Sequence, residues 1–262
     1  MPTPLFVRPP RAVYDRAGGG KEYFGASSYA TYNYLGGGLV GTVKTRHFEV
    51  ALRLAQALGV RGDVVDFGCA DGILLASLDK LYDSVLAVDI RPDFIEISDA
   101  VVSQLALTHT TTLCTEGLDW DQTIERIGAG SKSAIFLLET LEHIGDREAF
   151  YESKIEFLRR LSAVLTSDGV IIVSVPNMIG VSLLAQRLVL AATRKYREPL
   201  SIGELARGVL LHDVSGPQKR WTNIDHLGFN HRALDRALAP SFTIRRRRNI
   251  GVNVLYALQP IR

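Results

Sequence analysis

Short apolar runs alternate with longer amphipathic segments through most of this chain. Strands are predicted where the apolar runs are compact, at residues 63–67, 84–89, 110–115, 134–138 and 170–175. Helices are predicted where apolar residues recur every three or four positions, at residues 42–58, 72–81, 92–104 and 147–165. Continuous apolar stretches at 135–138 and 170–173 indicate strands buried on both faces, as in a parallel sheet covered by helices. The alternation therefore predicts a doubly wound α/β fold.

The chain closes with a different pattern. Residues 241–247 and 252–258 are two further strand candidates, and a short segment around Asn249-Ile250-Gly251 separates them. So short a connection suits a hairpin better than a crossover helix. We therefore expect a seven-stranded, mostly parallel sheet that ends in an antiparallel C-terminal strand pair.

Two segments fall outside the alternation. Residues 1–41 are rich in Pro, Gly and Tyr, and they are predicted to form an irregular N-terminal arm. Residues 178–225 are longer than ordinary loops in compact α/β proteins, and they are predicted to form a helical insertion or lid. The expected parts of this single domain, residues 1–262, are the arm, a cofactor-binding core at 42–177, the insertion, and the strand pair at 226–262.

Charge restricts the classes of partner. The chain has 30 basic and 28 acidic residues among 262, a formal charge of +2, which argues against a nucleic-acid partner. The run Arg245-Arg246-Arg247-Arg248 is a local exception and raises phosphate binding as an alternative. In an edge strand, however, such charges also protect the exposed edge from pairing with other chains.

Cys69 and Cys114 are the only cysteines, and neither stands in a paired metal-ligand spacing. We therefore expect no disulfide framework, no required metal and a cytoplasmic location. The longest apolar stretch, 179–192, is shorter than the roughly 20 residues that span a bilayer. With the basic residues that follow it, the segment 179–197 is interpreted either as a lid packed on the protein or as a surface helix that contacts a membrane.

The strongest chemical signal is the stretch Val64-Val65-Asp66-Phe67-Gly68-Cys69-Ala70-Asp71-Gly72. Its glycines permit a tight turn and a close approach of the backbone to a ligand, and the helix predicted after it exposes unpaired N–H groups. Asp89 ends the next predicted strand, 23 positions after Asp66. That spacing is close to the roughly 20 residues after which a carboxylate binds ribose hydroxyls in such folds. Together these features predict a site for a nucleotide-like cofactor.

These residues resemble the class I S-adenosylmethionine-dependent methyltransferases. Residues 65–72 are similar to the first motif of that family, and Val88-Asp89-Ile90 is similar to its ribose-binding strand end. Leu138-Glu139-Thr140-Leu141-Glu142-His143-Ile144 resembles the segment after the fourth strand in the ubiquinone-biosynthesis O-methyltransferase group, and residues 165–177 resemble the fifth-strand pattern. The likeness covers about residues 45–177. It implies a Rossmann-like sheet, S-adenosylmethionine as the cofactor and a small-molecule acceptor.

The resemblance also implies roles for individual residues. Gly68 and Gly72, with Cys69 and Ala70 between them, would bring the backbone close to the methionine part of the cofactor. Asp66 would orient this loop or bind the amino group of the cofactor. Asp89 would bind the ribose hydroxyls, and the backbone carbonyl of Leu138 would bind the methionine amino group. The adenine would be contacted by Ile90, Glu116, Gly117 and Leu118.

The sequence departs from the family pattern at two places. Ala70 replaces a common glycine, which requires an ordinary backbone conformation at that position. The residues after the third strand match poorly, so the adenine contacts are open, with Asp119 also nearby. No Asn-Pro-Pro-Tyr-like element follows the fourth strand, which argues against methyltransferases that act on the amino groups of adenine or glutamine. The resemblance to the ubiquinone-biosynthesis O-methyltransferase group implies methylation at oxygen, and methylation at nitrogen or carbon stays open.

Three residues are candidates for catalysis. His143 is the first candidate for a general base, since an unperturbed histidine titrates near neutrality; the alternative is that it caps the next helix or packs against Glu142. Glu139 is the second candidate, unless it only binds cofactor or water. His226 follows the predicted insertion and is either an acceptor-site residue or a structural histidine.

Two other functions stay open at this point. The same strand–loop–helix unit binds dinucleotides, so a nicotinamide-dependent oxidoreductase is one alternative, although the third glycine of its fingerprint is missing. A methyltransferase-like binding protein without turnover is the other.

The acceptor is interpreted as a hydroxylated ring, a sugar or a lipid-like compound, and the oligomeric state is unknown from the sequence. An aromatic group in the arm is predicted either to pack the arm onto the domain or to close over the site: Tyr23, Phe24, Tyr29, Tyr32 and Tyr34.

Overall fold

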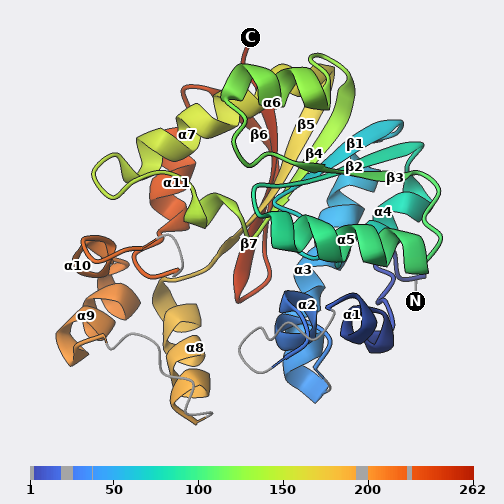
Figure 1. Ribbon diagram of the computed structural model, residues 1–262. Helices are drawn as coiled ribbons and strands as arrows, with labels where there is room; N and C mark the ends of the chain where they lie inside the picture. The colour runs from blue at the N-terminus through green and yellow to red at the C-terminus, as the bar shows by residue number, and fades with distance from the viewer. Residues whose placement is uncertain (1–2, 19–25, 37, 193–199, 223–225) are drawn as a thin grey trace. The chain divides into compact units, whose positions relative to one another are not determined.

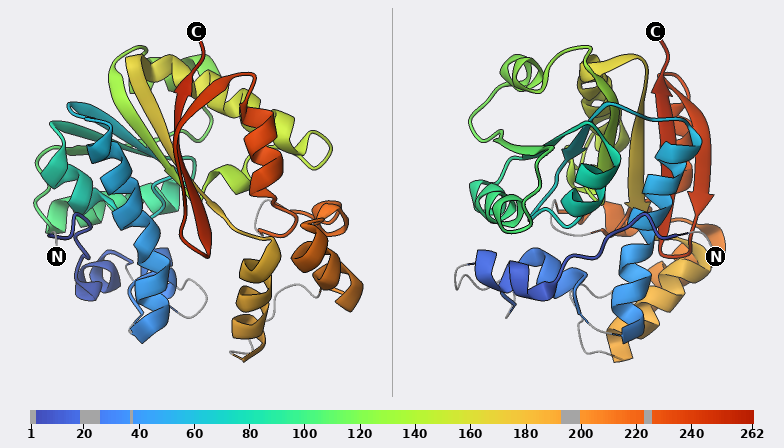
Figure 2. Two further views of the ribbon diagram at one scale, coloured as in Figure 1. Left: turned by 180° about the vertical axis from the view of Figure 1, so that it is seen from behind. Right: turned by 90° about the vertical axis from the view of Figure 1, so that its right-hand side faces the viewer.

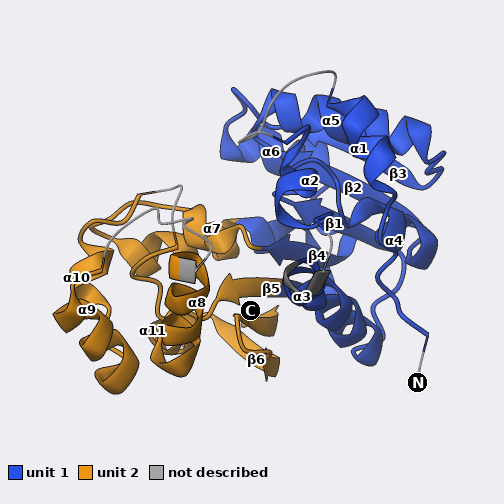
Figure 3. Ribbon diagram, turned by 90° about the horizontal axis from the view of Figure 1, so that it is seen from below, with its two compact units in different colours: residues 1–138, 161–172 blue, residues 139–160, 173–262 orange. Residues whose placement is uncertain are grey.

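The computed structural model describes residues 3–18, 26–36, 38–192, 200–222 and 226–262 (Figure 1). The chain divides into two compact units (Figure 3). The first contains residues 1–138 and 161–172, and the second contains residues 139–160 and 173–262. Each unit is described by itself below.

Seven strands form one sheet in the order β3-β2-β1-β4-β5-β7-β6. Their bounds are Asp63–Phe67 (β1), Ser84–Asp89 (β2), Thr110–Cys114 (β3), Lys132–Leu138 (β4), Leu165–Pro176 (β5), Phe242–Asn249 (β6) and Asn253–Pro260 (β7). Strands β3, β2, β1 and β4 pair in parallel, and β6 and β7 pair antiparallel. The predicted seven-stranded sheet with an antiparallel C-terminal pair is confirmed.

The central strands are buried on both faces, as their continuous apolar runs predicted. Val64 and Val65 in β1 and Ile135 and Phe136 in β4 are fully shielded from solvent. Side chains on both faces of a strand can be covered only when helices lie on either side of the sheet. The apolar runs therefore reflect position within the sheet and not only strand propensity.

The described residues of the first unit form six α-helices. They are α1 (Arg11–Ala17), α2 (Tyr29–Asn33), α3 (Gly38–Ala57), α4 (Leu75–Leu81), α5 (Pro92–Gln104) and α6 (Trp120–Ile127). Helices α4 and α5 pack on β2, α5 also packs on β3, and α3 packs on β4. Helix α5 begins at a proline, which is favoured in the first turn because its missing N–H has no helical partner there.

The prediction of an irregular arm over residues 1–41 is wrong, because α1 and α2 lie in it. Helix α1 is anchored by Val13 and Tyr14, which are buried, and the hydroxyl of Tyr14 donates to the carbonyl of Gly72 at 3.2 Å. Helix α2 starts where the Ser28 side chain accepts a hydrogen bond from the backbone N–H of Thr31. Both helices are too short to produce a readable periodicity.

The aromatic residues of the arm pack within the first unit where the structure describes them. The rings of Tyr34 and Phe48 lie 5.1 Å apart, and those of Tyr29 and Phe94 lie 5.8 Å apart. Such edge-on pairs stabilise packing beyond the area they bury. Tyr23 and Phe24 lie outside the described residues. For Tyr29 and Tyr34 the packing interpretation of the arm is thus supported.

In its described residues the second unit contains most of α7 (Phe150–Leu161). It also contains α8 (Gly180–Ala192), α9 (Ile202–Ala206), α10 (Ser215–Gln218) and α11 (His231–Leu238). It also contains the 3₁₀ turn η1 (Leu141–His143) and the π-helical turn η3 (Arg207–Leu211), which packs on α8 and α9. The predicted insertion is therefore helical where it is described. Figure 2 shows the long β6–β7 hairpin with α11 beside it.

Several predicted boundaries are wrong. The helix expected at 72–81 begins at Leu75, because Gly72 has a positive φ of 81° that no α-helix accommodates. The helix expected at 147–165 spans Phe150–Leu161, followed by the 3₁₀ turn η2 (Ser162–Val164), and β5 then begins at Leu165, five residues before the predicted start at 170. Helices α6 and α11 were not predicted.

The edge strand β6 contains the run of four arginines. All four side chains are exposed, and the register shifts between Ile244 and Arg246, which marks a bulge at the edge. Arg247 pairs with Asp235 at 3.4 Å. Charge and irregularity together protect this edge from pairing with another strand.

Candidate active site

The loop after β1 lies against the end of β2. The backbone N–H groups of Gly68 and Cys69 both donate to the carbonyl of Val88, at 2.7 and 3.1 Å. Gly68 and Gly72 have φ values of 76° and 81°, so each needs the conformational freedom of glycine. A Cβ at Gly72 would stand 2.8 Å from Leu75 Cδ1 and 3.1 Å from Ser98 Oγ. Both predicted glycines are therefore required by the geometry of the loop.

The prediction of an ordinary backbone at Ala70 is wrong. Ala70 has a φ of 48°, in the left-handed region that favours glycine. Its N–H donates to Asp89 Oδ2 at 2.9 Å, and its carbonyl accepts a hydrogen bond from Ser98 Oγ at 3.0 Å. These two bonds hold the residue in a conformation that costs an alanine about 1–2 kcal/mol.

The carboxylate of Asp89 stabilises the loop after β1 through hydrogen bonds. Its Oδ2 accepts the Ala70 N–H, and its Oδ1 accepts the N–H of Arg91 at 3.0 Å. The side chain is buried, and burial raises the pKa of its carboxyl. A carboxylate oxygen has two lone pairs, so each oxygen can accept a further hydrogen bond from a ribose hydroxyl. This location is consistent with the predicted ribose contact.

Asp66 lies at the same strand end and is 5% exposed. Burial, and secondly the charge of Asp89, raises the pKa of Asp66 to about 7.

Asp71 was not among the predicted site residues, although it stands in the same loop. It is fully buried, its Oδ2 accepts the N–H of Ala30 at 2.6 Å, and burial raises its pKa to about 6. The second acidic residue of the motif therefore joins the loop to α2.

The predicted adenine contacts lie at the ends of β2 and β3. Ile90 is 65% exposed, and the N–H of Thr115 donates to the carbonyl of Asp89 at 2.9 Å, so the two strand ends are adjacent. Glu116 and Gly117 are exposed, and Leu118 is half-buried, in the turn after β3. Asp119 accepts the N–H of Gln122 at 2.8 Å in a capping box that starts α6. Asp119 is thus accounted for as a helix cap.

Leu138 ends β4, which pairs with β1 on the side opposite β2. Parallel strands in a sheet end at the same edge, where open α/β folds bind their ligands. The structure therefore brings the predicted cofactor contacts in the first unit to one sheet edge. Those contacts are at Asp66, Gly68, Cys69, Ala70, Gly72, Asp89, Ile90, Glu116, Gly117, Leu118 and Leu138.

Glu139 belongs to the second unit and has a left-handed backbone, with a φ of 54°. Its Oε1 accepts hydrogen bonds from Ser174 Oγ at 2.8 Å and from Asn253 Nδ2 at 2.7 Å. Burial, and secondly the charge of Glu142, raises the pKa of Glu139 to about 7. A left-handed non-glycine residue fixed by side-chain hydrogen bonds is typical of a functional position.

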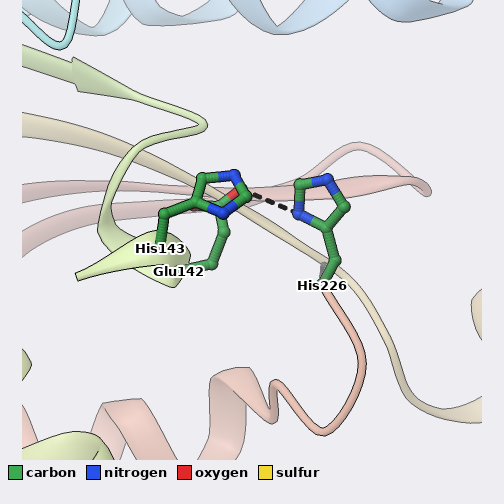
Figure 4. Close-up of side chains that lie close together, drawn as sticks. All are labelled: Glu142, His143 and His226. Carbon is green, nitrogen blue, oxygen red and sulfur yellow. Dashed lines mark ion pairs between the residues drawn. The ribbon is translucent and has the colours of Figure 1, made fainter. Parts of the chain in front are cut away.

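Glu142, His143 and His226 form a second cluster (Figure 4). Oε1 of Glu142 lies 3.2 Å from Nδ1 of His226 and 4.0 Å from Nε2 of His143. The two imidazole rings stand edge to face, with centroids 4.9 Å apart. Glu142 is fully buried, and burial raises the pKa of its carboxyl. The group offers three ligand atoms that all lie within 4.8 Å of one another.

Sequence reasoning selected both histidines but treated Glu142 only as a neighbour of His143. The signal was the acidic pair in Glu139-Thr140-Leu141-Glu142-His143, in which a charged residue stands at a position that the structure buries completely. No spacing rule could have joined His226 to this segment, because 82 residues separate His226 from His143.

Lys154, on α7, is a further buried charge near the cluster. Its Nζ donates to the carbonyl of Ile144 at 2.6 Å and lies 3.9 Å from the centre of the Phe150 ring. Burial lowers the pKa of Lys154 to about 8. A lysine on the apolar face of an amphipathic helix was the signal in the sequence, and it was not used.

Known proteins are similar to this chain in sequence or in fold. The model of the methyltransferase domain matches residues 42–208. A ubiquinone biosynthesis O-methyltransferase of Xanthomonas axonopodis pv. citri is 29% identical over 187 residues, which cover 64% of this chain and 69% of that protein. The PH0226 protein of Pyrococcus horikoshii OT3 has a similar structure, with a TM-score of 0.60 and 14% identity over 89% of this chain and 96% of that one. A SAM-dependent methyltransferase from Aquifex aeolicus has a TM-score of 0.51 and 13% identity over 80% of this chain and 89% of that one.

The match to the family model extends over more than half of the chain, so the chain belongs to the methyltransferase-domain family. The resemblance to the class I methyltransferases is thereby confirmed, and with it methyl transfer as the activity and S-adenosylmethionine as the methyl donor. None of the helices in the described part of the chain combines the length and apolar character needed to span a bilayer.

Proposed function

We propose that the protein methylates a hydroxyl group of a small molecule. The curated relatives named ubiquinone biosynthesis O-methyltransferase support oxygen as the acceptor atom. A hydroxylated ring fits the proposal best, and a sugar or a lipid-like compound with a hydroxyl group would use the same chemistry. The loop from Gly68 to Gly72, with Asp66 and Asp89, binds the methyl donor in this proposal.

The observation that carries the proposal is the pairing of two imidazoles with the buried carboxylate of Glu142. A sulfonium donor already supplies the electrophile, so the protein needs chiefly to position the acceptor and remove its proton. A carboxylate 3.2 Å from Nδ1 of His226 favours the tautomer in which Nδ1 bears a proton and Nε2 accepts one. His226 and His143 are therefore the candidate bases, Glu142 orients them, and Glu139 stays a further catalytic candidate.

The cofactor half of the proposal is tested by calorimetry with the full chain. We expect S-adenosylmethionine and S-adenosylhomocysteine to bind. Asp89→Asn should weaken the binding of both, because it removes the carboxylate that accepts the N–H groups of Ala70 and Arg91. Asp83→Asn, which changes an exposed carboxylate in the turn before β2, is the matched control. Absence of binding to either compound at millimolar concentration would refute the proposal.

The acceptor half is tested by incubating the chain with methyl-labelled donor and a panel of hydroxylated aromatics, sugars and lipid-like phenols. Transfer to oxygen supports the proposal, and exclusive transfer to nitrogen or carbon contradicts it. Tight binding of NADH with no affinity for the methyl donor would favour the oxidoreductase alternative. Donor binding without transfer to any member of the panel would favour a binding protein.

A further inference from the structure

The second unit contains a pocket that shares no residue with the cluster of Glu142, His143 and His226. Its walls come from the end of β5, the start of α8, the β6–β7 turn, the residue after η3 and the start of α11. Its volume is about 480 Å³. Sites for small molecules commonly have volumes of roughly 300–1,000 Å³, so the pocket can hold a small organic compound.

Hydrogen bonds hold the walls of this pocket in place. The carbonyl of Gly251, in the β6–β7 turn, accepts hydrogen bonds from Nδ2 of Asn177 at 2.8 Å and from Oγ of Ser182 at 2.9 Å. His212 has a left-handed backbone with a φ of 56°, and its carbonyl accepts a hydrogen bond from Nδ2 of Asn230 at 2.9 Å. A non-glycine residue fixed in this conformation by its surroundings is typical of a functional position. The pocket is therefore preformed by the fold.

Among the described residues that line the pocket, Arg232 has the only permanent charge and none is acidic. Its guanidinium donates to Nδ1 of His212 at 3.0 Å and has no other acceptor in the described part of the chain. Because an arginine only donates, Nδ1 of His212 holds a lone pair and the imidazole is neutral, with its proton on Nε2. This Nε2 lies beside Gly180, where an added Cβ would stand 3.2 Å from it.

The carboxylates closest to Arg232 along the chain have partners of their own. Asp235, one turn further along α11, pairs with Arg247 at 3.4 Å. Asp213, at the start of the segment between η3 and α10, pairs with Arg207. Most N–H groups of the Arg232 guanidinium are thus available to a ligand from outside the chain.

Two lining residues keep a buried polar atom that has no hydrogen-bond partner among the described residues. These atoms are Oδ1 of Asn177 and Nδ1 of His231, on residues that are 6% and 5% exposed. Buried polar atoms are nearly always paired, so two unpaired atoms on the walls of one pocket indicate that a ligand completes them. Burial, and secondly the charge of Arg247, lowers the pKa of His231 to about 4, so this imidazole is neutral at pH 7.

Charge and shape together define the class of ligand. One guanidinium balances a single negative charge, whereas a phosphate monoester carries about 1.5–2 negative charges at neutral pH. The planar guanidinium also matches the two oxygens of a carboxylate. The remaining walls include the apolar side chains of Ile179, Val181 and Val252. A ligand with one carboxylate and an apolar body fits both parts of the lining.

We propose that this pocket binds a small monocarboxylic acid whose carboxylate pairs with Arg232 and whose apolar body lies against the start of α8. An O–H or N–H group on that body would supply the missing partner of Oδ1 of Asn177. The proposal concerns binding alone and does not depend on the proposed function.

The ligand class is tested with benzoate, added to the full chain at pH 7 and followed by calorimetry and saturation-transfer NMR. We expect one saturable site. Benzamide has the same shape without the charge, so it should bind at least about 10-fold more weakly, the loss expected for a hydrogen bond to a charged group. Phenyl phosphate should also bind more weakly than benzoate, because its second charge has no partner in the pocket.

The location is tested with two pairs of variants. Arg232→Gln should weaken benzoate binding at least about 10-fold, and the exposed position of Arg232 means that the variant should fold. Arg236→Gln, at an exposed arginine one turn later in α11, is the matched control and should bind as the parent does. Ala185→Leu, which fills the pocket from α8, should also weaken binding, whereas Ala191→Leu, outside the lining on the same helix, should not.

Three results would overturn the site: no saturable benzoate binding at millimolar concentration, equal affinity for benzamide, or unchanged affinity in folded Arg232→Gln. Tighter binding of phenyl phosphate than of benzoate would overturn the assignment to carboxylic acids. The titrations are made without S-adenosylmethionine or S-adenosylhomocysteine, so a failed pocket and a failed methyltransferase give different results.

Discussion

At the scale of single residues, the loop after β1, which is the proposed cofactor loop, contains an alanine in a conformation that favours glycine. Ala70 has a φ of 48°, and its two hydrogen bonds link it to Asp89 and Ser98. The sequence showed that a glycine was replaced, but the size of the side chain gave no information about the backbone angle. That angle follows from the bonds at both ends of the residue, which only the folded chain supplies.

We expect Ala70→Gly to stabilise the protein by about 0.5–1 kcal/mol, because relief of left-handed strain exceeds the added entropy of the unfolded chain. Free energies of unfolding from urea titrations check this. Ala106 lies outside the loop and has a φ of 51°, so Ala106→Gly should also stabilise the protein. Ala100→Gly within α5, where the backbone is helical, should instead destabilise it by about 1 kcal/mol. Destabilisation by Ala70→Gly would show that the alanine conformation is not strained.

The pKa of Asp66 predicts a pH dependence of stability. Burial raises this pKa from 3.8 to about 7, so the folded state binds the proton more tightly than the unfolded state does. The stabilising contribution is complete below pH 3.8 and is lost as the pH rises through about 7. Asp66→Asn should therefore gain stability relative to the parent between pH 5 and pH 8, by an amount on the order of a few kcal/mol.

The measurement is the free energy of unfolding of cofactor-free protein at several pH values. Asp168→Asn, a change at an exposed carboxylate near the start of β5, is the matched control. An Asp66→Asn variant whose stability follows that of the parent at every pH would contradict the raised pKa.

At the scale of elements, strands were predicted better than helices. The strands β1 and β2 and the helix α5 have the predicted bounds, because their apolar runs match the burial imposed by the sheet. Helix α6 was missed because only Thr123 and Ile127 are buried in it. Its readable signal was the capping box formed by Asp119 and Gln122. Asp119 had instead been considered as an adenine contact.

We expect Asp119→Ala to lower the free energy of unfolding by about 1 kcal/mol, because the first turn of α6 loses its cap. S-adenosylhomocysteine affinity should stay unchanged in calorimetry. Asp121→Ala, in the first turn of the same helix, tests whether any acidic residue there has the same effect. A large loss of cofactor affinity in Asp119→Ala would return this residue to the cofactor site.

Helix α8 leaves several apolar side chains exposed, with Val181 at 79%, Leu188 at 63% and Val189 at 53%. Leu183 on the same helix is buried. Contact of residues 179–197 with a lipid surface stays a prediction, and residues 193–199 lie outside the described part of the chain. Co-sedimentation with anionic vesicles checks it: if α8 contacts lipid, Leu188→Asp should reduce the bound fraction, and Leu81→Asp, at an exposed leucine of α4, should not.

At the scale of the whole molecule, cofactor binding should stabilise the fold. A ligand that binds only the folded state at 100 times its Kd stabilises by about 2.7 kcal/mol. For a chain of this size that corresponds to a Tm increase of roughly 5–10 °C. S-adenosylhomocysteine should produce this shift in the parent and in Asp83→Asn, and a smaller one in Asp89→Asn at the same concentration. An equal shift in all three proteins would mean that Asp89 does not contribute to the cofactor site.

The sequence by itself determined the class of fold, the glycine turn after the first strand and, through the family resemblance, the methyl donor. Apolar periodicity, glycine and an acidic strand end are local patterns, and local patterns survive without knowledge of distant contacts. The tertiary structure decided the left-handed backbone at Ala70, the role of Asp71 and the assembly of Glu142, His143 and His226. Each of these depends on residues far apart in the chain, and no spacing within a sequence specifies which of them meet after folding.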